Sequence, residues 1–131
     1  MNIKRTRHAA YNINYHFVWI PKYRRRVLIG TIPERLTELL QEKTAELEGE
    51  ILNLTIQPDH VHFFCSFPPT IAPHQIMHRL KGYSAFMLRK EFPHLKSQLP
   101  NMWTRSYFVG TAGTVTAETI QRYIDEQKDA T

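Results

Sequence analysis

Two hydrophobic periods alternate along this 131-residue chain, and their order limits the folds that it can adopt. Apolar and polar residues alternate with the period of a β-strand in three segments, and a fourth strand is expected after them. The four predicted strands cover residues 11–20, 51–57, 60–67 and 103–109. Pro58 and Asp59 stand between the second and third strands and are typical of a tight turn, so these two strands are expected to form a hairpin.

Helical spacing of apolar residues appears in the segments between these strands. The first predicted helix begins at Pro33 and is expected to stop at Gly49. The second begins at Pro73 and ends near Pro93. A last helix over 117–129 follows the fourth strand, because apolar residues recur there at helical spacing.

The order of the first six elements is βαββαβ, which predicts an α+β fold of the ferredoxin-like, split-βαβ type. This RRM-like sandwich has a four-stranded antiparallel sheet with two helices on one face. The other face is open, or is covered only by the C-terminal helix or by a partner. We expect one domain over 1–131, with residues 1–10 as a flexible arm.

The composition is that of an ordinary soluble protein, with 42 % hydrophobic and 22 % charged residues. No apolar run reaches the ~18 residues of a membrane span, and no signal-peptide pattern opens the chain, so a cytoplasmic location is expected. A net charge of +5 suits a polyanionic partner. Cys65 is the only cysteine, which excludes an intramolecular disulfide framework and a thiolate metal cluster.

The third predicted strand places two histidines on one face. Side chains alternate across a strand, so the apolar set must face the helices, while His60 and His62 face the open side. The apolar set is Val61, Phe63, Cys65 and Phe67. Two imidazoles two residues apart can hold one metal ion. A pair of solvated surface histidines explains this spacing equally well.

The last predicted helix carries Tyr123 and Gln127, which are neighbours on one helical face. A tyrosine hydroxyl has a pKa of about 10 and is a poor nucleophile at neutral pH. Its attack on a phosphodiester needs the phosphate charge to be offset, which a divalent ion can do. A Gln oxygen is a hard, neutral ligand that suits Mg²⁺ or Mn²⁺. Taken alone, this helix is better explained as an ordinary amphipathic one.

Taken together, these segments resemble a known family. The run QPDHVHFF at 57–64 resembles the HUH motif, in which two histidines flank a bulky apolar residue. The run YIDEQ at 123–127 is similar to the Tyr-x-x-x-Gln segment of the single-tyrosine HUH transposases of the insertion-sequence-200-like family. The runs WIPKYRR at 19–25 and LKG at 80–82 also resemble stretches of those proteins. The resemblance extends from about Tyr15 to Lys128.

The resemblance implies a single-strand DNA transposase that acts at element ends bearing subterminal hairpins. Tyr123 is then the nucleophile that forms a 5′-phosphotyrosine link and leaves a free 3′-OH, which later rejoins strands without ATP. His60, His62 and Gln127 are implied as ligands of Mg²⁺ or Mn²⁺. The resemblance also implies a homodimer, in which Tyr123 can serve the histidines of the partner subunit.

Several residues are further candidates for the site and for DNA contact. A basic segment after the first strand can neutralise phosphates and stack on an unpaired base, although a solvated basic loop is the alternative. It consists of Lys22, Tyr23, Arg24, Arg25 and Arg26. Lys81 is a weaker candidate on the second helix. His16 lies on the open face of the first strand and is either a site-lining or a structural residue.

Three other functions share parts of this pattern. An RRM-like binding module has the same element order, but its aromatic-glycine signature is missing here. A two-histidine phosphoesterase needs a second His-x-Thr or His-x-Ser motif, which the chain lacks. A replication or relaxase-type HUH nickase often has two tyrosines on the nucleophile helix, whereas this helix carries only Tyr123. The site, and not the fold, has to decide among them.

Overall fold

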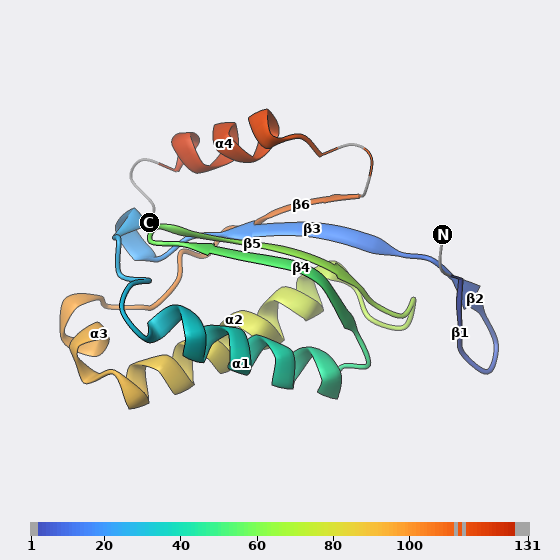
Figure 1. The fold of residues 1–131 in the computed structure, drawn as a ribbon, viewed down its shortest axis with the longest axis horizontal. Coiled ribbons are helices and arrows are strands. Elements are labelled where there is room, and N and C mark those ends of the chain that lie inside the picture. Colours follow the sequence, from blue (N-terminus) through green and yellow to red (C-terminus); the bar gives the residue numbers. More distant parts are fainter. Residues whose placement is uncertain (1–2, 112, 114, 128–131) are drawn as a thin grey trace.

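A four-stranded antiparallel sheet forms the centre of the computed structural model, which describes residues 3–111, 113 and 115–127 (Figure 1). Its strands lie in the order β4-β5-β3-β6. Their bounds are β3 Asn14–Trp19, β4 Glu50–Gln57, β5 His60–Ser66 and β6 Phe108–Thr111. All three neighbouring pairs are antiparallel. This is the predicted ferredoxin-like arrangement, so the fold prediction is confirmed.

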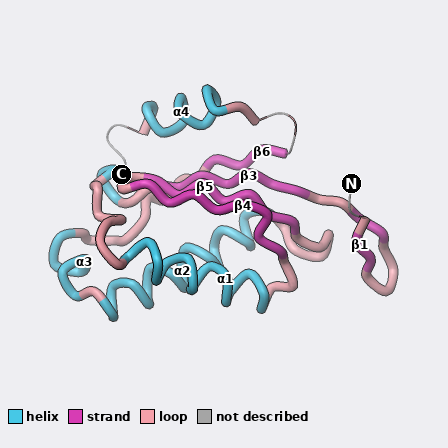
Figure 2. Tube along the Cα trace, in the orientation of Figure 1, coloured by secondary structure: helices cyan, strands magenta, loops and turns pink. Residues whose placement is uncertain are grey.

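Helices lie on both faces of the sheet (Figures 1 and 2). Helices α1 (Ile32–Glu46) and α2 (Pro73–Glu91) cover one face and pack against each other. Helix α4 (Ala117–Glu126) lies over the opposite face and runs back along the sheet after β6. The predicted helix over 117–129 therefore ends at Glu126, and residues 128 and 129 lie outside the described part of the chain.

The hydrophobic core lies between the sheet and the α1–α2 layer. Val61, Phe63 and Cys65 on β5 are fully buried, as the alternation predicts. Trp19 of β3 is also fully buried and packs edge-on against Phe63 and Trp103. Burial of each such large apolar side chain contributes roughly 1.5–3 kcal/mol. The core therefore fixes which face of β5 presents the two histidines.

The alternation in β4 is interrupted by a β-bulge. The register with β5 shifts between Ile51 and Asn53, so Leu52 is the extra residue and is 40 % exposed. Regular alternation along a strand would place Leu52, Leu54 and Ile56 on one face. In the structure Ile51 takes the place of Leu52 and packs against the core with the other two. A bulge changes the side-chain period by one residue, and hydrophobic alternation alone does not reveal it.

Helix α1 ends before the predicted glycine stop. Its C-cap is Leu47, and Glu48 adopts the left-handed conformation with φ of 63°. The N–H of Gly49 then donates to the carbonyl oxygen of Thr44 at 2.9 Å. A Cβ at position 49 would collide with the ring of Phe67. Glycine is therefore required here for close packing of the chain against Phe67.

Short elements appear where the sequence predicted none. Strands β1 (Lys4–Arg5) and β2 (Ala10–Tyr11) form a small hairpin in the segment expected to be an arm, and residues 1 and 2 lie outside the described residues. This hairpin projects from the body of the molecule (Figure 1). A short helix, α3 (Pro93–Gln98), follows α2, and a 3₁₀ turn, η1 (Lys22–Arg24), follows β3.

The fourth strand is shifted from its predicted position at 103–109. Trp103 forms only an isolated bridge with Pro21, and β6 begins at Phe108. The apolar character of Trp103 reflects its burial against Trp19 rather than a place in the continuous sheet.

None of the described helices combines the length and the apolar character needed to span a membrane.

Candidate active site

A pocket of about 370 Å³ lies between the sheet and α4 and contains two of the three predicted metal ligands, His60 and His62. His60 and His62 reach it from β5, and His16 reaches it from the neighbouring strand β3. Helix α4 closes it with Ala117, Ile120, Gln121 and Ile124. The predicted placement of both histidines on the face opposite α1 and α2 is therefore found in the structure.

His60 is held by an ionic chain that starts at Arg24. The Arg24 Nε–H donates to Asp59 Oδ2 at 3.0 Å, and the His60 Nδ1–H donates to Asp59 Oδ1 at 2.9 Å. Burial alone would raise the pKa of Asp59, but the hydrogen bonds from His60 and Arg24 lower it, so the carboxylate stays ionised. Because Nδ1 of His60 is engaged, Nε2 is the nitrogen available to a ligand. Carboxylate–histidine pairing of this kind orients imidazoles in metal sites.

His62 contacts a third histidine in the pocket. Nε2 of His62 lies 2.9 Å from Nδ1 of His16, so one imidazole donates to the other. The His16 ring also stacks on Phe64 with a centroid separation of 4.2 Å. Burial lowers the pKa values of His62 and His16, and the neighbouring charges of His16 and His60 lower that of His62 further. Both rings are therefore favoured in the neutral form that binds metals.

The donor set fits a divalent ion with an incomplete protein shell. His60 offers Nε2, and His62 can offer Nε2 once its contact with His16 is exchanged. No group of three or more His, Cys, Asp or Glu side chains arranged to hold a metal occurs among residues 3–111, 113 and 115–127. A third protein ligand would therefore have to be of another type, such as an amide oxygen, or come from another chain.

Tyr123 and Gln127 meet at Ser106, a residue that the sequence analysis did not single out. The Ser106 hydroxyl donates to Gln127 Oε1 at 3.2 Å and lies 3.1 Å from the Tyr123 hydroxyl. The Tyr123 ring contacts Phe108, with 6.0 Å between ring centroids. Burial raises the pKa of Tyr123, and the bond to Ser106 offsets part of this shift. The phenol is therefore held in its protonated, poorly nucleophilic form.

Within one chain the histidines and the tyrosine belong to separate parts of the site. The lining of the histidine pocket from α4 consists of Ile120, Gln121 and Ile124 with Ala117, and includes neither Tyr123 nor Gln127. Ile124 is 2 % exposed and is the residue through which α4 is buried. Each predicted pair is thus brought together, but among the described residues no hydrogen bond or ring contact joins Tyr123 or Gln127 to the histidines.

Two glycines, Gly110 and Gly113, lie in the segment that leads into α4. Gly113 has φ of 91°, a conformation that favours glycine. Gly110 is paired with His16 in the sheet, and the side chain of Val115 leaves no room for a Cβ there. Close packing therefore explains Gly110, and backbone conformation explains Gly113.

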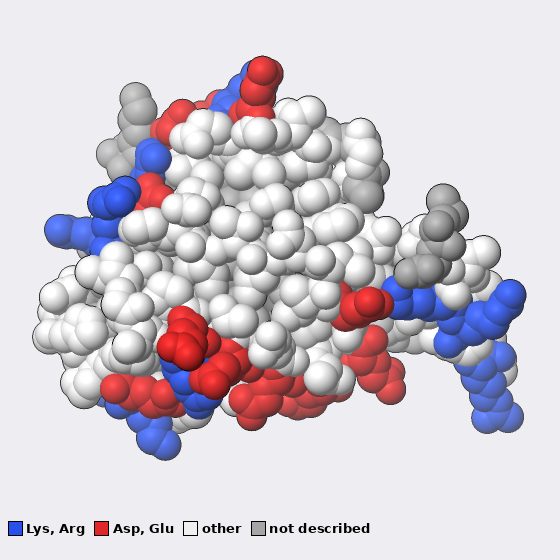
Figure 3. All heavy atoms as spheres, in the orientation of Figure 1, with Lys and Arg blue, Asp and Glu red and all other residues white. Residues whose placement is uncertain are grey.

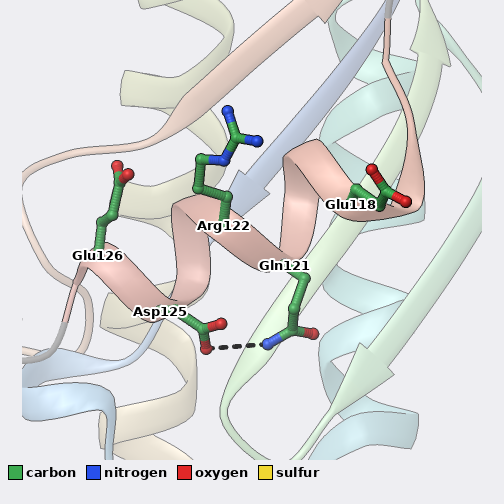
Figure 4. A pocket seen from close by; sticks show the side chains of 5 residues that line it. All are labelled: Glu118, Gln121, Arg122, Asp125 and Glu126. Atoms are coloured by element: carbon green, nitrogen blue, oxygen red, sulfur yellow. Dashed lines mark hydrogen bonds between the residues drawn. The ribbon is translucent and has the colours of Figure 1, made fainter.

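The outer face of α4 is predominantly acidic (Figure 4). Glu118, Asp125 and Glu126 surround a single cation, Arg122, along this face. Asp125 accepts a hydrogen bond from Gln121 at 3.0 Å. It also lies 3.5 Å from an Arg24 terminal nitrogen, so Arg24 joins α4 to the Asp59–His60 pair. This acidic face is unsuited to a phosphate backbone.

The residues predicted to contact DNA after β3 fall into two groups. Tyr23, Arg25 and Arg26 are exposed, and Tyr23 is 45 % exposed with its ring 5.5 Å from the Lys22 ammonium. Arg24 is committed to Asp59 and Asp125 instead. The first group is free to meet a ligand, while Arg24 serves the histidine pocket.

Lys81 points to backbone carbonyls on the segment before β6. Its ammonium group donates to the carbonyl oxygen of Thr104 at 2.6 Å and to that of Ser106 at 3.1 Å. Burial lowers the pKa of Lys81 to about 8. Lys81 therefore fixes the position of Ser106, the residue that contacts both Tyr123 and Gln127.

Solved structures of transposases share this fold. A crystal structure of a candidate transposase from Deinococcus radiodurans R1 superposes with a TM-score of 0.88 and 34 % identity, over 95 % of this chain and 97 % of that one. A REP-associated tyrosine transposase bound to a REP hairpin shares the fold, with a TM-score of 0.55 and 16 % identity over 93 % of this chain and 68 % of that one.

Sequence comparison identifies the family. The family described as "Transposase IS200 like" matches residues 9–127. The ISDra2 transposase TnpA of Deinococcus radiodurans is 34 % identical over 131 residues, covering 98 % of this chain and 94 % of that protein. The transposase for insertion sequence element IS200 of Salmonella typhimurium is 35 % identical over 122 residues, covering 92 % and 80 %. The chain therefore belongs to the IS200-like transposase family, whose members are DNA strand-transfer enzymes.

Proposed function

We propose that this transposase cleaves and rejoins single-stranded DNA at the hairpin-bearing ends of a small insertion sequence, with Tyr123 as its nucleophile. The observation that carries the proposal is the pre-oriented His60 beside His62, in a pocket covered by the helix that bears Tyr123. Such a carboxylate-oriented pair has no role in a passive RNA-recognition-like sheet, which uses aromatic side chains on its exposed face.

His60, His62 and Gln127 are the proposed ligands of Mg²⁺ or Mn²⁺. When bound, the ion supplies charge neutralisation at the scissile phosphate. Asp59 fixes the His60 ring, and the lowered pKa of His62 keeps its imidazole neutral. Gln127 contributes its Oε1 after leaving Ser106. Exchange of the Ser106 contacts thus releases the proposed nucleophile and the proposed amide ligand together.

The proposed reaction exchanges one phosphoester for another. The Tyr123 hydroxyl releases its proton as its oxygen forms a bond to phosphorus. The bond from phosphorus to the 3′-oxygen breaks, and that oxygen takes up one proton to leave a free 3′-OH, so the number of protons is conserved. In the reverse sense, a 3′-OH attacks the 5′-phosphotyrosine, joins the strands and returns the oxygen to Tyr123. The number of phosphoester bonds is conserved, so no ATP is required.

We propose that the active form is a homodimer in which Tyr123 of one subunit acts with the histidines of the other. The separation of the Tyr123–Gln127 pair from the histidine pocket within one chain supports this arrangement. The left-handed Gly113 in the connection before α4 suits a change in the path of that connection.

The exposed Tyr23, Arg25 and Arg26, with Lys22, are the proposed contacts to the DNA backbone.

The direct test is formation of a covalent protein–DNA adduct. The protein is incubated with Mg²⁺ or Mn²⁺ and single-stranded DNA from the element's ends, and the products are resolved on a denaturing gel. We expect a metal-dependent adduct that Tyr123→Phe abolishes and that Tyr83→Phe, in the α1–α2 layer, retains. An adduct of undiminished yield from Tyr123→Phe would remove Tyr123 as the nucleophile. Salt-sensitive binding with no adduct under any metal condition would indicate a binding module instead.

A further inference from the structure

A second groove, of about 410 Å³, lies between α2 and the segment that leads into β6. It is separate from the histidine pocket and shares no lining residue with it. From α2 it is lined by His74, Met77, His78, Lys81 and Gly82, and from the other side by Arg105 and Tyr107. We call it the α2 groove. Apart from Lys81, these residues take no part in the histidine pocket or in the contacts of Ser106 with Tyr123 and Gln127.

The charge of the α2 groove favours an anion. Lys81 and Arg105 contribute cations, and the described lining contains no carboxylate. The rest of the helical layer differs, because α1 exposes one acidic residue on each turn. These are Glu34, Glu38, Glu42 and Glu46. Carboxylates also lie on the outside of α4 (Figures 3 and 4). A polyanionic strand is thus favoured in the α2 groove over the acidic surfaces of α1 and α4.

Lys81 is positioned to bind a phosphate rather than only to cap carbonyls. An ammonium group has three N–H donors, of which the carbonyl oxygens of Thr104 and Ser106 take two. The third is free for an oxygen in the groove. Because both carbonyls hold the ammonium in place, little side-chain freedom is lost when an anion binds.

Gly82 gives independent support for a ligand. It lies within α2, where glycine costs about 1 kcal/mol relative to alanine. Packing does not require it, because a Cβ at this position would meet no atom within 4 Å. Its φ is not in the left-handed region either. A missing side chain on the wall of a cationic groove leaves the helix open to close approach by a ligand.

Ser106 connects the α2 groove to the nucleophile. Its carbonyl oxygen accepts from the ammonium of Lys81, while its hydroxyl contacts the phenol of Tyr123. The groove walls Arg105 and Tyr107 are its neighbours in the chain. A strand in the groove would therefore lie beside the residue that holds Tyr123 in its resting position.

We propose that the α2 groove binds a single-stranded part of the DNA substrate outside the histidine pocket, with Lys81 and Arg105 on a phosphodiester and Gly82 admitting the backbone. This inference rests on the proposed function, because it takes DNA to be the substrate of Tyr123. The α2 groove would be a second DNA-binding site, beside α2 and separate from the basic segment after β3.

The test is a chemical footprint at position 82. The full-length protein with Gly82→Cys is treated with N-ethylmaleimide, with and without saturating (dT)20 in EDTA, so that no cleavage intervenes. Cys65 does not react, because it is fully buried and burial raises the pKa of its thiol. We expect (dT)20 to slow alkylation at position 82 at least tenfold. Arg122→Cys, on the acidic face of α4, is the matched control and should show less than a twofold change.

A second measurement uses binding of fluorescein-labelled (dT)20 by anisotropy across NaCl concentrations. Arg105→Gln should weaken binding three- to tenfold and reduce the slope of log K against log salt by about 0.7, the value for one phosphate contact on a single strand. Gly82→Gln should weaken binding similarly, with thermal unfolding showing an intact fold, while Arg122→Gln stays within twofold of the unaltered protein.

Equal alkylation of position 82 with and without bound (dT)20 would overturn the inference, as would unchanged binding by both Arg105→Gln and Gly82→Gln. If either occurs while the unaltered protein forms the Tyr123 adduct, the proposed function stands and only the α2 groove is excluded. Protection at position 82 without any adduct would leave the groove as a single-strand DNA site in a protein that lacks the proposed reaction.

Discussion

Arg24 illustrates how the role of a single side chain can differ from that of its neighbours in a basic run. The sequence places it among four other residues suited to DNA contact. In the structure, Tyr23 and Arg24 adopt positive φ values of 61° and 52° within the turn after β3. Arg24 pairs with Asp59 and reaches Asp125, while Arg25 and Arg26 stay exposed. Arginines of one segment thus have two different roles. Arg24 supports the histidine pocket, whereas Arg25 and Arg26 remain on the solvent-exposed surface.

The Asp59 carboxylate is expected to set the metal affinity of the histidine pocket. Asp59→Asn removes the charged acceptor of the His60 Nδ1–H and breaks the ion pair with Arg24. We expect Mn²⁺ affinity, measured by calorimetry, to fall about 10–100-fold. Asp125→Asn loses only the 3.5 Å contact to Arg24 and serves as the control. An unchanged affinity in Asp59→Asn would mean that His60 is not a ligand through Nε2.

Lys81 gives a pH dependence to DNA binding in the α2 groove. The pKa of this buried lysine is lowered to about 8, so its charge is present below that pH and lost as the pH rises above it. Binding of (dT)20 should therefore weaken from pH 7 to pH 9 more steeply in the unaltered protein than in Lys81→Met. The groups around it are Arg105, His74, His78 and the ring of Tyr107 at 5.9 Å. A parallel decline in both proteins would show that another group titrates.

Helix α4 is the least firmly attached of the long helices. It buries only Ile124, whereas α2 buries Ile76, Met77, Leu80, Ser84 and Leu88. Its other contacts are the ring contact of Tyr123 with Phe108 and polar links through Ser106 and Arg24. Because apolar burial supplies most of the free energy that holds an element in place, α4 can leave the sheet at a smaller cost than α2.

Hydrogen exchange should reveal this difference between the helices. We expect the backbone amides of α4 to exchange at least tenfold faster than those at the centre of α2, measured by mass spectrometry at neutral pH. Ser106→Ala should accelerate exchange in α4 further, because it removes the contacts to Tyr123 and Gln127. Protection of α4 equal to that of α2 would contradict a helix that detaches readily.

The capping residue of α4 provides a second test at this scale. The Thr116 side-chain oxygen accepts from the N–H of Thr119 at 3.1 Å, as expected for the residue before a helix. Thr116→Ala should destabilise the helix by about 1 kcal/mol. The expected result is faster exchange confined to α4, with the midpoint of global unfolding almost unchanged. A large fall in that midpoint would show that α4 unfolds together with the core.

The predictable features of the elements were those that depend on periodic burial. The alternation through Val61 and Phe63 correctly assigned the two faces of β5, and hence the side on which His60 and His62 lie. The bulge at Leu52 escaped prediction because Ile51 and Leu52 are both apolar, so either residue fits the core side of the alternation. Ser106 escaped it as well, since a serine in a loop carries no pattern, and only the folded chain brings it to Tyr123.

At the scale of the whole molecule, charge is distributed unevenly over the surface. Lys and Arg gather at the projecting β1–β2 hairpin and at the end that carries η1, while carboxylates follow the helical side between them (Figure 3). The hairpin is tied to β4 by the ion pair of Lys4 with Glu50 at 2.9 Å. A net charge of +5 therefore understates the local field that a nucleic acid would meet at either end.

Mixed subunits distinguish action of Tyr123 within a chain from action across the dimer. Tyr123→Phe and His62→Ala are each expected to be inactive alone. If Tyr123 serves the partner's histidines, a mixed dimer contains one intact site, and mixing the two proteins after mild denaturation should restore adduct formation. If Tyr123 serves its own chain, no mixture recovers activity. The measurement is adduct yield against the ratio of the two variants at constant total protein.

The contact of Tyr123 with Ser106, away from the histidines of its own chain, has a consequence for how often the insertion sequence transposes. In the proposed dimer the reaction requires a helix from a second copy of the chain. Then, at concentrations where few dimers form, its rate is proportional to the square of the protein concentration in the cell. Halving expression would cut the number of competent assemblies about fourfold by mass action. A low concentration of the transposase would then be enough to limit transposition, with no dedicated repressor.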